Sequence, residues 1–302
     1  MSVLHTPVLL KAVLEWLRIR PEGTYVDATA GTGGHAIEIA RRLATGRLVA
    51  VDRDPRALEI ARERLKEFSD RVVFVHAEFS RIGEVAANLG LPPVDGVLAD
   101  LGISTLELDD PTRGFSFRWP APLDMRMNPD SPLTAAEIVN HWPEKELADL
   151  LYLRAEERNS RRIARAIVRA RPIRDTAHLA TVVAGVQKVR GRQKLHPATK
   201  TFLALRTAVN REEEDLEQFL SWTPATLNSG GRWIILSYHS LEDRMVKRAF
   251  QKYEREGVMR ILTKKVIQPS EEEIRINPRS RSAKMRVAEK LSSVSGEEMS
   301  MA

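Results

Sequence analysis

Two kinds of apolar pattern alternate along the first hundred residues. Four short runs are almost continuously apolar, as strands buried on both faces are, and they lie at residues 24–29, 47–52, 71–76 and 94–100. Segments with the helical spacing of apolar positions lie between them, at residues 35–43, 55–68 and 81–89. Asp54 and Pro55 give the second of these helices a cap and a first residue. Strand–helix alternation of this kind predicts a parallel sheet with helices on both faces.

The pattern becomes helical after the fourth strand. Residues 109–132 are rich in Pro, Arg, Asp and Met, and no convincing strand pattern follows before residue 210. Helical spacing is found at residues 135–140, 144–153, 160–170, 176–186 and 199–210. Strand character returns at residues 231–237 and 284–288, with helices at 212–220 and 242–254. The sequence therefore predicts a discontinuous α/β domain, residues 1–104 and 211–302, interrupted by an all-helical insertion, residues 105–210.

The composition narrows the class of protein. The chain has 302 residues, 43% of them hydrophobic, which is enough for cores in about two domains. It contains no cysteine, which excludes disulfides, zinc–thiolate sites and iron–sulfur clusters and fits the reducing cytoplasm. No apolar run approaches the roughly 18 residues of a membrane span, so we expect no membrane contact. The seven histidines lack metal-binding spacing, and we expect no metal.

Positive charge is concentrated in the predicted insertion. The formal net charge is only +6, yet residues 151–211 contain 15 Lys and Arg against 3 Asp and Glu, a local balance of +12. Such a region indicates a surface that faces a polyanion, although a solvated helical face would carry the same charge. The candidate RNA-binding residues are Arg158, Arg161, Arg162, Arg165 and Arg169 on one broad helical face, and Lys188, Arg190 and Lys194 in a basic loop.

The first predicted strand runs into a glycine-rich segment. Residues 27–35 read D-A-T-A-G-T-G-G-H, which places Gly31, Gly33 and Gly34 between a strand and a helix. Glycines there let the backbone approach a ligand closely, and the start of the helix offers N–H donors. The segment also fits the loose dinucleotide pattern G-x-G-x-x-(G/A), so a nicotinamide dinucleotide and S-adenosylmethionine (SAM) are both candidate ligands.

Each of the next three strands leads to a residue that suits an adenosine ligand. Asp52 closes the second strand and can accept hydrogen bonds from both ribose hydroxyls. Phe79 follows the third strand, where its ring packs either on adenine or in the core, and Asp100 closes the fourth. Ligands of open α/β sheets bind at the carboxyl ends of the strands, so these positions predict one binding site. A methyltransferase, a nicotinamide-dependent dehydrogenase and a non-catalytic RNA-binding assembly factor are the candidate functions.

Ten collinear motifs extend over nearly the whole chain. In order they are H-T-P-V-L-L (5–10), D-A-T-A-G-T-G-G-H (27–35), A-V-D-R-D-P (50–55), D-L-G-I-S (100–104), R-G-F-S-F (113–117), L-D-M-R-M (123–127), R-I-A-R-A-I-V (162–168), H-P-A-T-K-T-F (196–202), Y-H-S-L-E-D-R (238–244) and N-P-R-S-R-S (277–282). With these motifs the chain resembles the RsmH (formerly MraW) family, the bacterial small-subunit ribosomal RNA cytosine-N4 methyltransferases.

The resemblance implies a Rossmann-like SAM-dependent methyltransferase fold with a helical insertion, and SAM as the methyl donor. It implies as acceptor the exocyclic N4 amine of a decoding-centre cytosine, position 1402 in the usual 16S ribosomal RNA numbering, within an assembled or assembling small subunit. A monomer and a homodimer both remain compatible with it. The family's donor-site residues fall on Gly33, Gly34, His35, Asp52, Phe79, Asp100 and Glu107. Glu107 stands where the family commonly has Gln, so it keeps an acceptor but lacks the amide donor.

Methylation of an aromatic amine makes specific demands on the site. The N4 lone pair is delocalised into the ring, so the protein must hold nitrogen, methyl carbon and sulfur in line and accept hydrogen bonds from the amine. We expect Asp100 to border both groups and to take part in catalysis. The absence of cysteine excludes the covalent route of cytosine-C5 methyltransferases. His239 is expected on the substrate side of the pocket or in simple packing, because Y-H-S-L-E-D lacks a hydrolase nucleophile elbow.

The D-L-G-I-S segment has no aromatic residue to stack the base, unlike the corresponding loop of many amino-methyltransferases. The candidate replacements are Phe115, Phe117 and Tyr238.

Overall fold

The computed structural model describes residues 7–186 and 196–292, and the chain divides into two compact units. The first unit is discontinuous and comprises Met1–Gly102 and Glu214–Ala302, while the second is the intervening Ile103–Glu213. The expected insertion, residues 105–210, falls inside the second unit. The basic loop residues Lys188, Arg190 and Lys194 lie outside the described residues.

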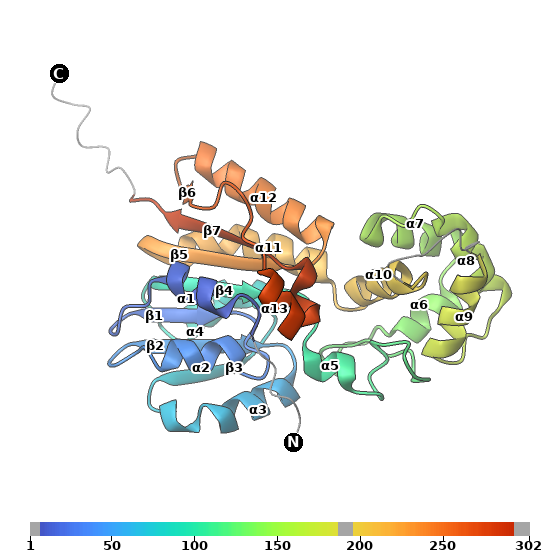
Figure 1. Cartoon of the computed structure of the whole chain (residues 1–302), viewed down its shortest axis with the longest axis horizontal. Coiled ribbons are helices and arrows are strands. Elements are labelled where there is room, and N and C mark those ends of the chain that lie inside the picture. The colour runs from blue at the N-terminus through green and yellow to red at the C-terminus, as the bar shows by residue number, and fades with distance from the viewer. Residues whose placement is uncertain (1–6, 187–195, 293–302) are drawn as a thin grey trace. The chain divides into compact units, whose positions relative to one another are not determined.

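The first unit is built on a seven-stranded sheet with the order β3-β2-β1-β4-β5-β7-β6 (Figure 1). The strands are β1 (Thr24–Asp27), β2 (Arg47–Asp52), β3 (Val72–His76), β4 (Val94–Asp100), β5 (Leu227–Ser237), β6 (Met259–Ile261) and β7 (Lys284–Lys290). Neighbours among β1 to β5 are parallel, whereas β7 runs antiparallel to both β5 and β6. The predicted parallel α/β sheet is confirmed, and an antiparallel pair extends it.

Helices cover both faces of this sheet (Figure 1). One face carries α1 (Leu10–Leu17), α2 (Gly34–Ala40) and α3 (Pro55–Arg64). The other carries α4 (Ile82–Asn88), α11 (Glu212–Thr226) and α12 (Ser240–Arg255). Successive residues of the central strands belong to opposite cores: Leu98 and Ile234 face the first set of helices, and Ala99 and Trp233 face the second. Burial on both faces explains why these strands are apolar at nearly every position.

Local sequence sets the start of the helix that follows β2. The Asp54 side chain caps α3 by accepting a hydrogen bond from the N–H of Arg56, and Pro55 occupies the first turn. The predicted helix over 55–68 is present, but α3 ends at Arg64 and a short 3-10 turn covers Lys66–Phe68. None of the helices in the described ranges combines the length and the apolar character that crossing a bilayer requires.

The second unit is helical, and its described residues contain no strand. Its helices are α5 (Thr105–Asp109), α6 (Ala135–His141), α7 (Glu144–Ala155), α8 (Ser160–Arg169), α9 (Thr176–Val186) and α10 (Thr199–Val209). Residues from α6 to α10 form a separate core, to which the irregular segment 110–134 adds Met125 and Met127. Asn210 fixes that segment, because its side chain accepts from the Met127 N–H at 2.7 Å and donates to the Met125 carbonyl at 2.8 Å.

Candidate functional site

Three aspartates end neighbouring strands at one edge of the sheet. Asp27, Asp52 and Asp100 are the last residues of β1, β2 and β4, and β1 lies between the other two. Asp27 is 1% exposed, whereas Asp52 and Asp100 are partly exposed. The negative charges of Asp100 and Asp52 both act on Asp27. Our sequence reasoning gave Asp27 no role, although an acid at the end of a buried first strand was an available signal.

Burial keeps a proton on Asp27 up to neutral pH. The pKa of Asp27 is raised to about 7. Desolvation is the main cause, the charges of Asp100 and Asp52 add to it, and the hydrogen bond from the Thr29 N–H acts in the opposite direction. Oδ1 accepts the Thr29 N–H at 3.3 Å, while Oδ2 has no hydrogen-bond partner among the described residues. An unpaired buried carboxyl oxygen is energetically costly. A ligand that donates a hydrogen bond to this oxygen, or whose positive charge displaces the proton, would remove that cost.

The Asp52 carboxylate organises the glycine-rich segment. Its Oδ2 accepts the Gly31 N–H at 2.7 Å, and its Oδ1 accepts the Asp54 N–H at 2.8 Å. Desolvation nevertheless outweighs these donors and raises the pKa of Asp52. Each carboxylate oxygen has a second lone pair, so both can still accept a hydrogen bond from a ribose hydroxyl. The same carboxylate that fixes the glycine-rich loop is thus the one predicted to bind the ribose.

The glycine loop fits between its neighbours only without side chains. Gly33 has φ +84°, a left-handed conformation that favours glycine, and a Cβ there would lie 2.6 Å from Cδ1 of Leu65. Gly34 begins α2, where a Cβ would lie 2.8 Å from Cγ of Pro7. The loop is therefore held between the end of α3 and the N-terminal segment.

His35 packs inside the fold with its ring neutral. Its Nε2 lies 3.0 Å from the carbonyl oxygen of Val8, and its Nδ1 lies 3.8 Å from Oδ2 of Asp100. Burial lowers the pKa of His35 to about 4. Because a carbonyl only accepts, we assign the proton to Nε2, which donates to Val8. The side chain therefore anchors the N-terminal segment on α2. If His35 contacts a ligand, it does so through its backbone.

The neighbouring strand orients the Asp100 carboxylate. The Tyr238 hydroxyl, directly after β5, donates to Oδ1 of Asp100 at 2.7 Å. Burial raises the pKa of Tyr238 well above its usual value, and the Asp100 charge adds to the shift, so the hydroxyl remains a donor. The Asp100 N–H also donates to Oγ1 of Thr29 at 2.6 Å. Tyr238 was a candidate for stacking the base, and its hydroxyl instead contacts the proposed catalytic carboxylate.

Phe79 belongs largely to the core. It is 7% exposed and packs edge-to-face on Phe219 at 5.3 Å, with the Arg53 guanidinium 5.2 Å from its ring centre. The Asp215 carboxylate fixes the residues around Phe79, because it accepts hydrogen bonds from the Arg53 guanidinium at 2.8 Å and from the Ser80 hydroxyl at 3.0 Å. Only a small part of the Phe79 ring is left for an adenine.

The remaining predicted residues make local contacts. In the second unit, Glu107 completes a capping box of α5, accepting the Ser104 N–H at 2.7 Å, and its side chain is buried. In the first unit, His239 precedes α12 with Nε2 3.0 Å from Oε1 of Glu242. Phe115 and Phe117 pack in the core of the second unit. The five arginines predicted on one helical face are all exposed: Arg158, Arg161, Arg162, Arg165 and Arg169. Arg158 lies in the turn before α8, which begins at Ser160, so the helical face carries only the other four.

Comparison with known proteins decides the class of enzyme. A family model described as the MraW methylase family matches residues 2–291. This chain belongs to the MraW methylase family. A protein of Solibacter usitatus named "Ribosomal RNA small subunit methyltransferase H" is 52% identical over 286 residues, covering 95% of this chain and 99% of the relative. One of the same name from Koribacter versatilis is 50% identical, covering 94% and 93%.

Among solved structures, an rRNA methylase from Streptococcus thermophilus aligns over 94% of each chain with a TM-score of 0.44 and 13% sequence identity. Its family makes the chain a SAM-dependent methyltransferase, and its parallel sheet with helices on both faces is Rossmann-like. The dehydrogenase and the non-catalytic assembly factor are set aside.

The charges at the strand ends fit SAM better than a dinucleotide. Besides its α-carboxylate, SAM carries a sulfonium and an α-ammonium, whose positive charges complement the Asp100 carboxylate and favour ionisation of Asp27. A dinucleotide would instead place a negative pyrophosphate beside the same carboxylates. The nearby Arg53 guanidinium is already paired with Asp215. These residues would hold SAM by its ribose at Asp52 and by its cationic end near Asp27 and Asp100.

Proposed function

We propose that this MraW-family protein transfers a methyl group from SAM to the exocyclic N4 amine of a cytosine in the decoding centre of 16S ribosomal RNA, position 1402 in the usual numbering. The name shared by its relatives at about 50% identity supports the small-subunit RNA substrate. The observation that carries the chemistry is the Asp100 carboxylate at the end of β4, held by the Tyr238 hydroxyl at 2.7 Å.

The proposed donor site combines backbone and side-chain contacts. Asp52 takes the ribose, Phe79 offers an edge to the adenine, and Asp27, whose ionisation the positive charge favours, lies behind the cationic end. The other members are Gly33, Gly34, the His35 backbone and Asp100.

Asp100 is the proposed acceptor for the amine protons. Bound SAM supplies an electrophilic methyl group on a sulfonium. The Tyr238 hydroxyl fixes the Asp100 carboxylate before the RNA arrives, so an amine N–H meets an acceptor that need not reorganise. A hydrogen bond to Asp100 localises the nitrogen lone pair, and the proton can leave to the carboxylate as or after the methyl arrives. His239 is proposed on the substrate side of this site.

The second unit is the proposed RNA-recognition domain. Its exposed arginines on and beside α8 would contact phosphates, and phosphate contacts position an RNA without reading its sequence. The target cytosine must leave its stack to reach a methyl donor. We propose the assembled or assembling small subunit as substrate.

The test compares small subunits with naked 16S RNA, both purified from a strain that lacks the enzyme, using SAM with a labelled methyl group. We expect label in one cytosine of the small subunit. Asp100→Asn should slow transfer on the order of 100-fold, because it removes a proton acceptor from the site. Asp70→Asn is the matched control, since that carboxylate is 65% exposed and pairs with Arg71. Label absent from the small subunits would contradict the proposed substrate, and a wild-type rate in Asp100→Asn would contradict the proposed acceptor.

A further inference from the structure

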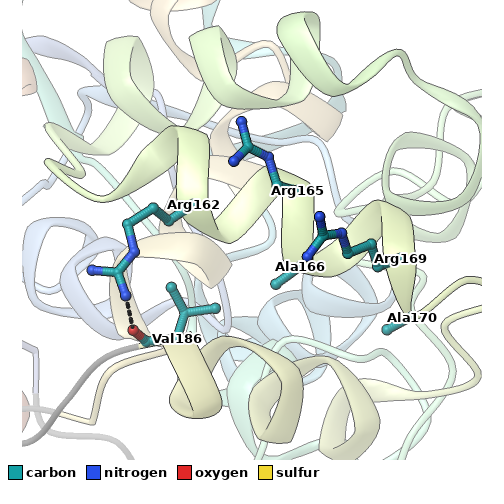
Figure 2. A pocket seen from close by; sticks show the side chains of 6 residues that line it. All are labelled: Arg162, Arg165, Ala166, Arg169, Ala170 and Val186. Carbon is teal, nitrogen blue, oxygen red and sulfur yellow. Dashed lines mark hydrogen bonds between the residues drawn. The ribbon is translucent and has the colours of Figure 1, made fainter.

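A basic hollow lies on the surface of the second unit, where α8 meets the end of α9 (Figure 2). Its volume is about 500 Å³. The lining residues are Arg162, Arg165, Ala166, Arg169, Ala170 and Val186. We call this feature the α8 hollow. No residue of the donor site in the first unit belongs to it.

The spacing of residues along α8 creates the hollow. Ile163, Ala164 and Ile167 of this helix are buried in the core of the unit. Positions three and four residues apart on the other side of the helix carry the arginines and the two alanines. Alanines there leave room between the long side chains, and Val186 contributes to the same apolar surface (Figure 2). The lining therefore combines three small apolar side chains, which we call its floor, with three guanidinium groups.

The three arginines of the hollow have little counter-charge of their own. Arg162 donates to the carbonyl oxygen of Val186 at 3.1 Å, which holds it at the rim without neutralising it (Figure 2). Arg165 lies 3.4 Å from Glu144, with both side chains more than 40% exposed, so this pair is weak. Within the described residues Arg169 has neither a hydrogen bond nor an ion pair. Such a cluster favours an anionic ligand.

We propose that the α8 hollow binds one unpaired nucleotide of the RNA substrate, with its phosphate between Arg165 and Arg169 and its base on the floor of Ala166, Ala170 and Val186. The proposal rests on the proposed function, because it takes RNA as the ligand. A volume of about 500 Å³ lies within the ordinary range of small-ligand sites. Guanidinium planes stack on unpaired bases, and a paired base cannot turn into a hollow. An acidic peptide has the charge but no flat apolar face to match the floor.

The test measures binding of the full chain to a fluorescent single-stranded RNA of the decoding region, by anisotropy over a range of salt concentrations. Arg165→Ala and Arg169→Ala should each weaken binding about 10-fold and lower the salt slope by about 1. Arg174→Ala is the matched control, because Arg174 is exposed in the same unit but neither lines the hollow nor belongs to the candidate RNA-binding arginines. It should change binding less than about 2-fold.

Ala166→Leu separates shape from charge. It fills the hollow and keeps every arginine, so we expect about 10-fold weaker binding of the single strand with an unchanged salt slope. Unchanged thermal unfolding of each variant establishes that the fold is retained.

Equal losses for Arg174→Ala and Arg165→Ala, or full binding by Ala166→Leu, would overturn the hollow while leaving RNA binding and the proposed function intact. Equally tight, hollow-dependent binding of poly-glutamate would replace the nucleotide with an acidic peptide. No RNA binding and no methyl transfer by the wild type would instead contradict the proposed function.

Discussion

Replacing Asp27 with Asn should stabilise the SAM-free protein increasingly as the pH rises. The folded state keeps this carboxyl protonated up to about pH 7, whereas the unfolded chain releases the proton near pH 4. Between these values the folded state binds one more proton, so the free energy of unfolding of the wild type falls with rising pH. Between pH 5 and pH 8 this extra proton is present over about 2 pH units, up to about pH 7. The free energy of unfolding of the wild type should therefore fall by about 3 kcal/mol over that range.

Asn suits this position because it has nearly the shape of Asp and cannot ionise. Its Oδ1 can still accept the Thr29 N–H. The assay is equilibrium unfolding in urea, without SAM, at about pH 5 and pH 8. The free energy of unfolding of the variant minus that of the wild type should rise by about 3 kcal/mol from about pH 5 to pH 8. A difference that stays constant with pH would refute the buried proton. Asp70→Asn is the control, because Arg71 lowers the pKa of that exposed carboxyl and no gain toward pH 8 is expected.

The same substitution should weaken SAM binding. A cationic ligand favours ionised Asp27, so near pH 7 the wild type should release part of a proton on binding SAM. Calorimetry in two buffers of different ionisation enthalpy measures that release, and Asp27→Asn should abolish it. We expect about 5-fold weaker SAM binding by the variant. S-adenosylhomocysteine lacks the sulfonium charge and should be affected less. Equal losses for the two ligands would show that Asp27 does not respond to the sulfonium.

Three further substitutions test other parts of the site. Tyr238→Phe removes the donor that orients Asp100. The kcat for methyl transfer should therefore fall about 10-fold with little change in the KM for SAM. A change confined to KM would contradict that role. Gly33→Ala forces a Cβ into a left-handed residue 2.6 Å from a leucine methyl, and should cost about 1–3 kcal/mol in urea unfolding and weaken SAM binding, whereas unaltered stability would contradict the tight fit. Asp215→Asn removes the carboxylate that pairs with Arg53 and should lower the free energy of unfolding by about 2–3 kcal/mol. Unchanged unfolding would show that the pair is dispensable.

The sheet could be predicted from sequence because its strands are buried on both faces. Continuous apolar runs identify β1 to β4, and the intervening helical patterns require parallel pairing. The short elements could not be predicted: β6, α5 and α13 (Glu271–Ile276) have three to six residues, too few to show a period. β5 begins at Leu227, four residues before its apolar run, because Asn228, Ser229 and two glycines hide its start.

The candidate site was predictable only as far as the strand ends. Parallel strands finish at one edge of a sheet, so the positions of Asp52 and Asp100 follow from the strand pattern. The contact between Tyr238 and Asp100 depends on the register of β4 with β5, in which Asp100 pairs with Leu236. Strand pairing over more than a hundred residues of separation leaves no trace in a single sequence. The proton on Asp27 likewise depends on the packing of neighbouring strands.

Nucleoside analysis of the methylated RNA tests the central claim most directly. Small subunits from a strain lacking the enzyme are incubated with the purified protein and with SAM carrying a deuterated methyl group, and the digested RNA is examined by mass spectrometry against authentic methylcytidines. We predict that the label elutes and fragments as N4-methylcytidine, and that Asp100→Asn reduces its amount on the order of 100-fold. Label in 5-methylcytidine or 3-methylcytidine would contradict transfer to the exocyclic amine.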